Sequence, residues 1–579
     1  MISRIRKALC DTSLVQSFSG VRTVFGHGPD ISEELKALAM GYGYCYARRT
    51  ILNGTAVLLI GRDPRPTGAA IASAIARGFL AGAAAQRSEV TLIDLGIITT
   101  PLAETAVRSL DADGGVMITA SHNPIDNNGF KFLTGCSGCG ENSAPAGALL
   151  SARSMGDVIA GVQALADGLD HEFERFAAGV TPDVVDKAMD NPDSEHSRVK
   201  AERAYLDVIG ADWGIAPHCL KPFTLGPVLL DPNGGAGCGI DARVLEHFGV
   251  RVIEINAELG YPEHGIDTDG IDPASGRHML LRVSRAAARN RAHFGVAFDY
   301  DADRGNLVLP GHDESAIIPP QRVATFNIAL ALARRKLQGG SDKPLAVVAS
   351  DATSLASHRV AEAFGAEVFQ VETGEINVVS KMHALREAGY DVPVGVEGAN
   401  GGTIFESATC RDGLQVALSA AQAESMPEVA CEWMRVVSGL NGSQFDGSCG
   451  VTLQELIDSV PVNPNVMLRL SSPPMPHADV KRKMEEHFKL VSWPALCSRF
   501  TRYEFENFEE TRMVEIRTGD ESGAWRVVLH APDRRGFVFV RGSRTESGVW
   551  RMIIDTDHAD DFEPVSMCAK EMFAAATGS

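Results

Sequence analysis

Short apolar runs alternate with longer amphipathic stretches over most of this 579-residue chain. Runs of four to eight apolar residues bounded by polar residues are typical of buried strands, whereas apolar positions spaced three or four apart indicate helices. In the first part, the strand-like runs are 56–60, 90–95 and 115–118, and the helical patterns are 31–48, 68–86 and 101–110. This alternation predicts a parallel sheet covered by helices.

The same style repeats twice and then changes. A second unit has strand-like runs at 227–231, 250–255 and 294–298, and a third has them at 345–349, 367–371 and 392–396. After residue 440 the pattern becomes antiparallel in style, with runs at 512–516, 525–529, 536–541 and 549–554 and a helix from about 560. We expect an α/β chain of three similar domains with mixed, mostly parallel sheets and a C-terminal α+β domain with an antiparallel sheet. The expected boundaries are 1–200, 201–314, 315–440 and 441–579, the last range including a linker.

Composition and charge narrow the classes of partner. The formal net charge of −20 argues against nucleic acid or an anionic membrane as the main partner. No uncharged apolar run is long enough to span a membrane, since the best candidate, 68–85, is interrupted by Arg77. The amino terminus lacks the apolar segment of a signal peptide. Eleven scattered cysteines suit a reducing compartment, so we expect a cytoplasmic protein.

One serine lies where phosphate chemistry is expected. The run 113–118 predicts a buried strand, and it leads into the segment Thr119-Ala-Ser-His-Asn-Pro124. Open α/β sheets bind their ligands at the carboxyl ends of strands, which is where Ser121 falls. Around it stand His122 as a candidate proton-transfer group, the Asn123 amide and the Lys131 cation.

A second motif carries three alternating acids. In Phe298-Asp-Tyr-Asp-Ala-Asp-Arg304, the carboxylates of Asp299, Asp301 and Asp303 can converge on one hard cation such as Mg²⁺. An EF-hand loop would need glycine at its sixth position and glutamate at its twelfth, and Arg304 and Pro310 stand there instead. The remaining rival is a dehalogenase-type phosphatase with Asp299 as nucleophile. That hypothesis leaves the Ser121 motif unexplained.

A third motif follows the apolar run 536–540. Val540-Arg-Gly-Ser-Arg-Thr-Glu546 combines two guanidiniums, two hydroxyls and loop amides, which suits a dianionic phosphate. The order of the three motifs and the Ser121 segment resemble the α-D-phosphohexomutases, the family of phosphoglucomutase and phosphomannomutase, in which the serine carries a phosphoryl group. The third motif resembles the family's fourth-domain phosphate loop at Arg541, Ser543, Thr545 and Glu546. It departs from the family at Arg544, where a small residue is usual.

The resemblance extends to two weaker elements. Ser19-Gly-Val-Arg22 resembles the family's amino-terminal element, whose arginine lies near the reacting groups. The run 395–403 resembles the sugar-recognition loop, in which a glutamate and a nearby polar residue bind ring hydroxyls. Glu397 and Asn400 stand further apart than in the family pattern. Either the loop is one residue longer, or Gly398 occupies the place of the glutamate.

The resemblance implies an intramolecular phosphotransferase, which is an isomerase. It would interconvert hexose 1-phosphate and hexose 6-phosphate through a phosphoserine enzyme and a hexose 1,6-bisphosphate that also acts as activator. Glucose or mannose phosphate is the first expectation, and the phosphates of glucosamine and N-acetylglucosamine are the alternatives. The expected state is a monomer or homodimer.

The resemblance also assigns roles to residues of this chain. Lys131 ranks ahead of Arg22 for proton transfer, because an arginine is a poor base, and His122 stands beside the serine. Mg²⁺ is expected on Asp299, Asp301, Asp303 and phosphorylated Ser121. The expected substrate-binding residues are Asn123, Arg304, Glu397, Asn400, Arg541, Ser543 and Thr545.

Overall fold

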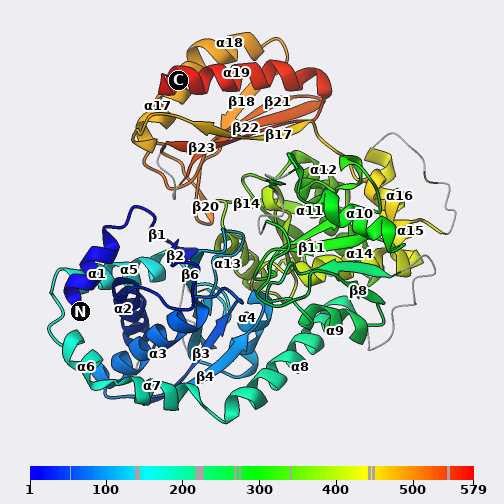
Figure 1. The fold of residues 1–579 in the computed structure, drawn as a ribbon. Coiled ribbons are helices and arrows are strands. Elements are labelled where there is room, and N and C mark those ends of the chain that lie inside the picture. Colours follow the sequence, from blue (N-terminus) through cyan, green and yellow to red (C-terminus); the bar gives the residue numbers. More distant parts are fainter. Residues whose placement is uncertain are drawn as a thin grey trace. The chain divides into compact units, whose positions relative to one another are not determined.

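The structure is a computed structural model that describes residues 1–51, 54–136, 144–214, 227–265, 270–272, 275–339, 342–440, 445, 450–543 and 548–578 (Figure 1). The chain divides into two compact units. Unit 1 comprises Met1–Ile318 and Ile404–Ala421, and unit 2 comprises Pro319–Thr403 and Gln422–Ser579. In both units, the sheets have the strand pairing that the sequence predicts for the same residue ranges.

Unit 1 begins with a six-stranded mixed sheet in the order β1-β2-β6-β5-β3-β4. β3 pairs in parallel with β4 and β5, which confirms the predicted alternation of strands and helices, while β6 runs antiparallel to β5 and β2. β6 is not among the predicted strands, because it begins with the turn-like residues Asn-Asn-Gly. The strands are β1 (Val15–Ser17), β2 (Gly20–Val24), β3 (Thr55–Arg62), β4 (Glu89–Ile97), β5 (Gly114–Ile118) and β6 (Asn127–Thr134).

Helices accompany this sheet and continue beyond it: α1 (Ile2–Leu9), α2 (Glu33–Thr50), α3 (Gly68–Ala85), α4 (Thr100–Ser109), α5 (Ala152–Ala166), α6 (Phe173–Gly179), α7 (Pro182–Met189) and α8 (Asp193–Trp213). Within the described ranges, α3 alone is long and apolar enough to cross a membrane, and 61% of that stretch is buried inside the fold. Its apolar residues join the core with those of α2. The apolar composition of α3 is therefore explained by its place in the core.

Helices α2 and α3 touch through their backbones. A Cβ atom added at Gly78 would lie 2.2 Å from the carbonyl oxygen of Met40, and one at Gly82 would lie 2.8 Å from that of Tyr44. No real side-chain atom tolerates such distances, so these glycines set how closely the two helices approach.

The second sheet of unit 1 has the order β12-β11-β7-β8 and confirms the three predicted strands. β11 pairs in parallel with β7 and antiparallel with β12, so the loop between β11 and β12 carries the predicted acidic motif. The elements are β7 (Val228–Asp231), α9 (Ile240–His247), β8 (Val252–Glu254), β9 (Ile271–Asp272), β10 (Arg277–His278), α10 (Leu281–Arg289), β11 (Gly295–Phe298), β12 (Gly305–Val308) and the 3₁₀ helix η2 (Glu314–Ala316).

The segment Ile404–Ala421 lies far along the chain yet belongs to unit 1. Tyr205 of α8 donates a hydrogen bond to Asp412 at 2.8 Å, and Trp213 donates one to Gln415 at 2.7 Å. All four residues are buried. These contacts attach the segment to α8 and fix the residues beside it.

Unit 2 contains two sheets. In the order β14-β13-β15-β16, strand β13 pairs in parallel with both β14 and β15, as predicted. From residue 320 to residue 459 the elements are α11 (Pro320–Leu337), β13 (Leu345–Ser350), α12 (Leu355–Ala363), β14 (Glu367–Val371), α13 (Glu375–Glu387), β15 (Asp391–Glu397), the 3₁₀ helix η3 (Gly398–Asn400), β16 (Gly402–Phe405), α14 (Gly413–Ser425), α15 (Pro427–Leu440) and α16 (Leu453–Ser459). The end of β16 and most of α14 fall in the segment Ile404–Ala421, which belongs to unit 1.

The last sheet is antiparallel in the order β17-β23-β22-β21-β18, which confirms the change of style. The predicted strand at 512–516 is wrong. Only Arg512–Met513 form a strand, which pairs with β19 outside this sheet, because the chain bends away at Glu515 and Ile516. The elements are β17 (Asn465–Ser471), α17 (His477–His487), the π-helix η4 (Phe488–Ser492), α18 (Trp493–Leu496), β18 (Arg502–Phe505), β19 (Phe508–Glu509), β20 (Arg512–Met513), β21 (Trp525–Ala531), β22 (Arg534–Gly542), β23 (Val549–Thr556) and α19 (Ala559–Thr577).

Each of the four large sheets falls inside one of the four predicted domain ranges. The boundaries themselves stay predictions. Helix α8, for example, continues through residue 200.

The contact between α2 and α3 generates the first prediction. We expect Gly78→Ala to destabilise the protein by about 2 kcal/mol or more, because the added methyl group forces the two backbones apart. The matched control is Gly156→Ala in α5, where nothing lies within 4 Å of the new Cβ. Alanine should be neutral there or stabilise by up to about 1 kcal/mol. Thermal unfolding measures both, and equal midpoints for the two variants would contradict the packing account.

Candidate functional site

The loop after β5 holds Ser121 in a fixed, unusual conformation. Its φ of 51° lies in the left-handed region, which a non-glycine residue adopts only when its surroundings enforce it. Arg65 supplies that enforcement: its guanidinium donates to the carbonyl oxygens of Ser121 at 2.7 Å, Asn123 at 2.6 Å and Asn127 at 2.8 Å. Arg65 is buried and also pairs with Asp63 at 3.1 Å. Arg65 is not among the predicted site residues.

The three predicted acids converge in the β11–β12 loop. One carboxylate oxygen from each of Asp299, Asp301 and Asp303 lies within 4.8 Å of the others, and all three residues are buried. The Ser121 hydroxyl donates to Oδ2 of Asp299 at 2.8 Å. Oδ1 of Asp301 and Oδ1 of Asp303 are buried and accept no hydrogen bond from the described residues. This donor set fits a hard divalent cation.

Mutual repulsion of these acids points to the same conclusion. Burial and the charges of Asp303 and Asp301 raise the pKa of Asp299 well above its ordinary value. Burial acts in the same direction on Asp303, but Arg411, Lys131 and Arg304 outweigh it and hold the pKa of Asp303 below its usual range. A divalent cation would allow all three acids to stay ionised.

Cations surround the triad. Lys131 on β6 is buried and donates to Asp301 at 2.9 Å and to Asp303 at 3.3 Å. Arg411 donates to the same oxygen of Asp303 at 2.7 Å. Nε of Arg304 lies 3.5 Å from Asp299. The structure therefore brings the predicted Lys131 and Arg304 to the acids and adds Arg411, for which the sequence offers no motif.

His122 connects the serine loop to the acidic loop. Its Nδ1 lies 3.4 Å from the Ser121 hydroxyl and accepts a hydrogen bond from Arg304. Arg304, burial and Arg22 lower the pKa of His122 well below its ordinary value. The ring is therefore neutral at physiological pH, with its proton on Nε2, and it orients the Arg304 guanidinium.

Two further predicted residues lie in unit 1. Arg22 sits on β2 opposite Gly129 of β6, and burial lowers its pKa while Asp301 opposes that effect. Asn123 lies in the serine loop, where its backbone bonds to Ala120 and Arg65. The charges of Asp301, Asp303, Arg304 and Arg411 all influence Arg22, so it belongs to the same electrostatic cluster.

In unit 2, the predicted sugar loop brings Glu397 and Asn400 together. The 3₁₀ helix η3 follows Glu397, and residues three apart lie on the same side of such a helix. The Asn400 amide donates to Glu397 at 3.4 Å. A Cβ at Gly398 would lie 2.2 Å from the Gln321 side chain, so position 398 faces the protein interior. The geometry favours the longer loop over the alternative in which Gly398 takes the place of the glutamate.

The phosphate-loop motif follows the end of β22. Arg541 is half-buried, and its guanidinium donates to the Thr373 carbonyl at 3.3 Å and to Glu372 at 3.4 Å. The Ser543 amide donates to the Val549 carbonyl at 2.7 Å. The predicted Thr545, with Arg544 and Glu546, lies outside the described residues.

Asp351 is an additional buried acid beside this motif. It follows β13, and its Oδ1 accepts the amide of Thr373 at 2.9 Å and the hydroxyl of Thr373 at 2.6 Å. Its Oδ2 is buried and accepts no hydrogen bond from the described residues. Burial raises the pKa of Asp351 to about 6, although the Thr373 hydroxyl and Arg541 counteract it.

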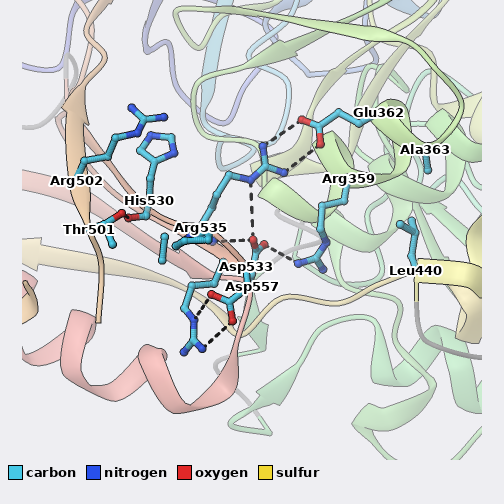
Figure 2. A pocket seen from close by; sticks show the side chains of 13 residues that line it. Arg359, Glu362, Ala363, Leu440, Thr501, Arg502, His530, Asp533, Arg535 and Asp557 are labelled. Atoms are coloured by element: carbon cyan, nitrogen blue, oxygen red, sulfur yellow. Dashed lines mark hydrogen bonds and ion pairs between the residues drawn. The ribbon is translucent and has the colours of Figure 1, made fainter. Parts of the chain in front are cut away.

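An open cavity of about 720 Å³ lies elsewhere in unit 2, between α12, β18, the β21–β22 turn and the end of β23 (Figure 2). Arg535 pairs with Glu362 at 3.1 Å, and Arg359 pairs with Asp557 at 2.5 Å. Figure 2 shows these residues as a connected network. Because carboxylates already offset these guanidiniums, the network serves to attach α12 to the antiparallel sheet rather than to attract an anion.

The acidic triad generates a prediction about metal. We expect Asp301→Asn to weaken Mg²⁺ binding at least about tenfold, because it removes the negative charge of one of the three acids that would bind the cation. Calorimetric titration with Mg²⁺ measures this directly, and Asp157→Asn on the surface of α5 is the control. Equal affinities in wild type and Asp301→Asn would rule out the triad as the metal site.

Asp351 generates a prediction about pH. Because its pKa is raised to about 6, Asp351 binds a proton more tightly in the folded state than in the unfolded chain. Above pH 6 the ionised carboxylate therefore lowers the free energy of unfolding, and this loss disappears as the pH falls from 6 to 4. An asparagine side chain at this position keeps an oxygen for Thr373 without the charge. We expect Asp351→Asn to be about 2–3 kcal/mol more stable than wild type at pH 8. The gain at pH 5 should be smaller. Urea titrations at both values measure it, and a gain independent of pH would refute this reading.

Family models and curated relatives match parts of this chain. Residues 15–139 match the family model described as "Phosphoglucomutase/phosphomannomutase, alpha/beta/alpha domain I", and residues 326–429 match that of domain III. A phosphoglucosamine mutase of Clavibacter sepedonicus is 29% identical over 65% of this chain and 71% of its own length. One from Caldicellulosiruptor saccharolyticus is 27% identical over 62% of this chain and 68% of its own length.

Solved structures share the fold over nearly the whole chain. A phosphoglucomutase/phosphomannomutase family protein from Burkholderia thailandensis has a TM-score of 0.64 and 17% identity, covering 98% of both chains. The parafusin phosphoglucomutase of Paramecium has a TM-score of 0.63 and 16% identity, covering 98% of this chain and 96% of its own. The two family-model matches and the curated relatives support membership of the α-D-phosphohexomutase family, and the solved structures show that the chain has the fold of these mutases.

Proposed function

We propose that this enzyme interconverts the 1-phosphate and 6-phosphate of a hexose by way of a phosphoryl group on Ser121. One observation carries the proposal: the Ser121 hydroxyl lies 2.8 Å from a buried triad of acids that fits a divalent cation. A phosphoserine there would add about −1.5 to −2 charges beside that cation and its surrounding basic residues.

The residues of unit 1 would carry out the transfer. Mg²⁺ held by Asp299, Asp301, Asp303 and the phosphoserine would stabilise the negative charge that the transferred group develops. Arg304, oriented by His122, and Arg411 place further positive charge at the site. Catalysis of this kind is mainly positioning and charge stabilisation.

The transfer balances as an exchange of one proton for one phosphoryl group. The bond between phosphorus and the Ser121 oxygen breaks while a substrate hydroxyl oxygen bonds to phosphorus, and the hydroxyl proton ends on Ser121. We assign the proton relay to Lys131, with Arg22 giving electrostatic help. The hydrogen bond from Ser121 to Asp299 is the arrangement expected for the dephosphorylated enzyme.

The residues of unit 2 would hold the rest of the substrate. Arg541, Ser543 and Thr545 are assigned to the phosphate that does not react, and Glu397 and Asn400 to the ring hydroxyls. The hexose 1,6-bisphosphate formed by the first transfer would reverse its orientation and return a phosphoryl group to Ser121. The same bisphosphate would rephosphorylate enzyme that has lost its phosphoryl group.

The relatives change the order of the candidate sugars. Glucose and mannose phosphate are the first expectation from the sequence, but two curated relatives of this chain, from Clavibacter sepedonicus and Caldicellulosiruptor saccharolyticus, are phosphoglucosamine mutases. We therefore propose glucosamine phosphate as the substrate, with glucose and mannose phosphate as alternatives. A small-molecule substrate, a cytoplasmic location and a monomeric or homodimeric state remain parts of the proposal.

The dehalogenase-type alternative has less support. Asp299 accepts the Ser121 hydroxyl on Oδ2 and the Arg304 amide on Oδ1, so neither oxygen is reserved for attack on phosphorus. Its raised pKa also makes it a poorer nucleophile without a cation. Both observations favour a ligand role for Asp299.

The test is a coupled assay with Mg²⁺ and a trace of hexose 1,6-bisphosphate, offering the 1-phosphates of glucosamine, glucose, mannose and N-acetylglucosamine in parallel. We expect the highest kcat/KM with glucosamine 1-phosphate and a loss of at least about 10³-fold in Ser121→Ala, because the covalent route is removed. Ser154→Ala on α5 is the control. Activity that is indifferent to Ser121 would refute the proposal.

A further inference from the structure

Glu372 joins separate segments of unit 2. It follows β14, is 1% exposed, and exchanges backbone and side-chain bonds with Glu510 in the turn between β19 and β20. The Glu372 amide donates to the Glu510 carbonyl at 2.9 Å, and Oε2 of Glu372 accepts the Glu510 amide at 2.9 Å. The Ser522 hydroxyl donates to the same Oε2 at 2.8 Å. Figure 1 shows the β19–β20 hairpin reaching from the antiparallel sheet toward β14.

These bonds direct the other carboxylate oxygen at Arg541. Oε1 of Glu372 accepts from Nη2 of Arg541 at 3.4 Å, while Nη1 donates to the Thr373 carbonyl at 3.3 Å. Thr373 is itself held by its two hydrogen bonds to Asp351. The guanidinium is thus held from one side by two consecutive residues, both of which are fixed by further bonds.

We propose that Glu372 is a positioning residue that pre-organises Arg541 for the phosphate of the substrate, so that the turn after β14 sets the strength of phosphate binding. The inference rests on the proposed function, in which Arg541 binds the phosphate that does not react. It adds a residue that would not touch the substrate and that none of the sequence motifs includes.

The physical reason is the cost of ordering an arginine. Its long side chain has many rotamers, and the entropy lost on fixing one of them weakens binding when the free side chain is mobile. A carboxylate and a carbonyl that already hold one edge of the guanidinium remove this cost and leave its other N–H groups for a phosphate. Glu372 can do this because Glu510 and Ser522 occupy its other oxygen.

A simpler role for Glu372 would be to hold the antiparallel sheet against the rest of unit 2. Other contacts already do so, including an apolar cluster that combines Ala352 and Leu355 with Phe537, Phe539 and Ile553. The Glu362–Arg535 pair also joins α12 to β22, roughly 20 Å along the strand from Arg541 at 3.3 Å per residue. Glu362 is therefore a matched control for docking alone.

The experiment measures substrate binding without turnover. In a Ser121→Ala background with Mg²⁺, calorimetry gives the dissociation constant of glucosamine 6-phosphate for the parent and for four variants: Glu372→Gln, Glu362→Gln, Arg541→Gln and the double variant Glu372→Gln/Arg541→Gln. We expect Glu372→Gln to weaken binding about tenfold, which corresponds to about 1.4 kcal/mol. Glu362→Gln should bind like the parent. The double variant should bind no more weakly than Arg541→Gln.

Three outcomes would overturn the inference. Glu372→Gln with parental affinity would show that Arg541 needs no such support. Equal losses in Glu372→Gln and Glu362→Gln would show a docking effect, and a full loss from Glu372→Gln in the Arg541→Gln background would show that Glu372 acts elsewhere. If the Ser121→Ala parent binds no hexose phosphate at all, the proposed function fails, and the inference fails with it.

Discussion

Three buried carboxylates, each with an oxygen within 4.8 Å of the others, are the constraint on which the candidate site depends. Ionised acids this close repel strongly in a protein interior, and burial together with that repulsion raises the pKa of Asp299 well above its ordinary value. Lys131, Arg304 and Arg411 offset part of the charge. Each of these cations comes from a different element, so the acidic loop organises β6, the β11–β12 connection and the distant segment Ile404–Ala421 around itself.

A second buried charge, that of Arg65, positions the serine loop beside these acids. Arg65 donates to four loop carbonyls, those of Ser121, Asn123, Pro124 and Asn127, and holds Ser121 in a left-handed backbone conformation, which aims its hydroxyl at Asp299. The conformation costs about 1–3 kcal/mol. Its persistence therefore depends on Arg65, whose own charge is balanced by Asp63. The Ser121 hydroxyl and the three acids are thus positioned by charge pairs rather than by apolar packing alone.

Much of this arrangement could be predicted from the sequence, and the reasons for the rest are physical. The strands at 56–60, 90–95 and 115–118 are predictable because each is a short apolar run. The acidic triad is predictable because its three acids stand at alternate positions of one short segment. Arg411 lies more than 100 residues from the acid that it contacts, and a pairing of that kind leaves no local pattern. The prediction of a strand at 512–516 is wrong because the chain bends after Met513, although the residues have a β-forming composition.

The central claim is that Ser121, and not Asp299, carries the phosphoryl group. The most direct measurement is to incubate the protein with hexose 1,6-bisphosphate and Mg²⁺, digest it, and locate the phosphate by mass spectrometry before and after a chase with hexose monophosphate. The account predicts one phosphoryl group on the peptide containing Ser121, resistant to hydroxylamine and discharged by the chase. A hydroxylamine-labile phosphate on the peptide containing Asp299, or a Ser121 phosphate that the chase does not remove, would contradict it.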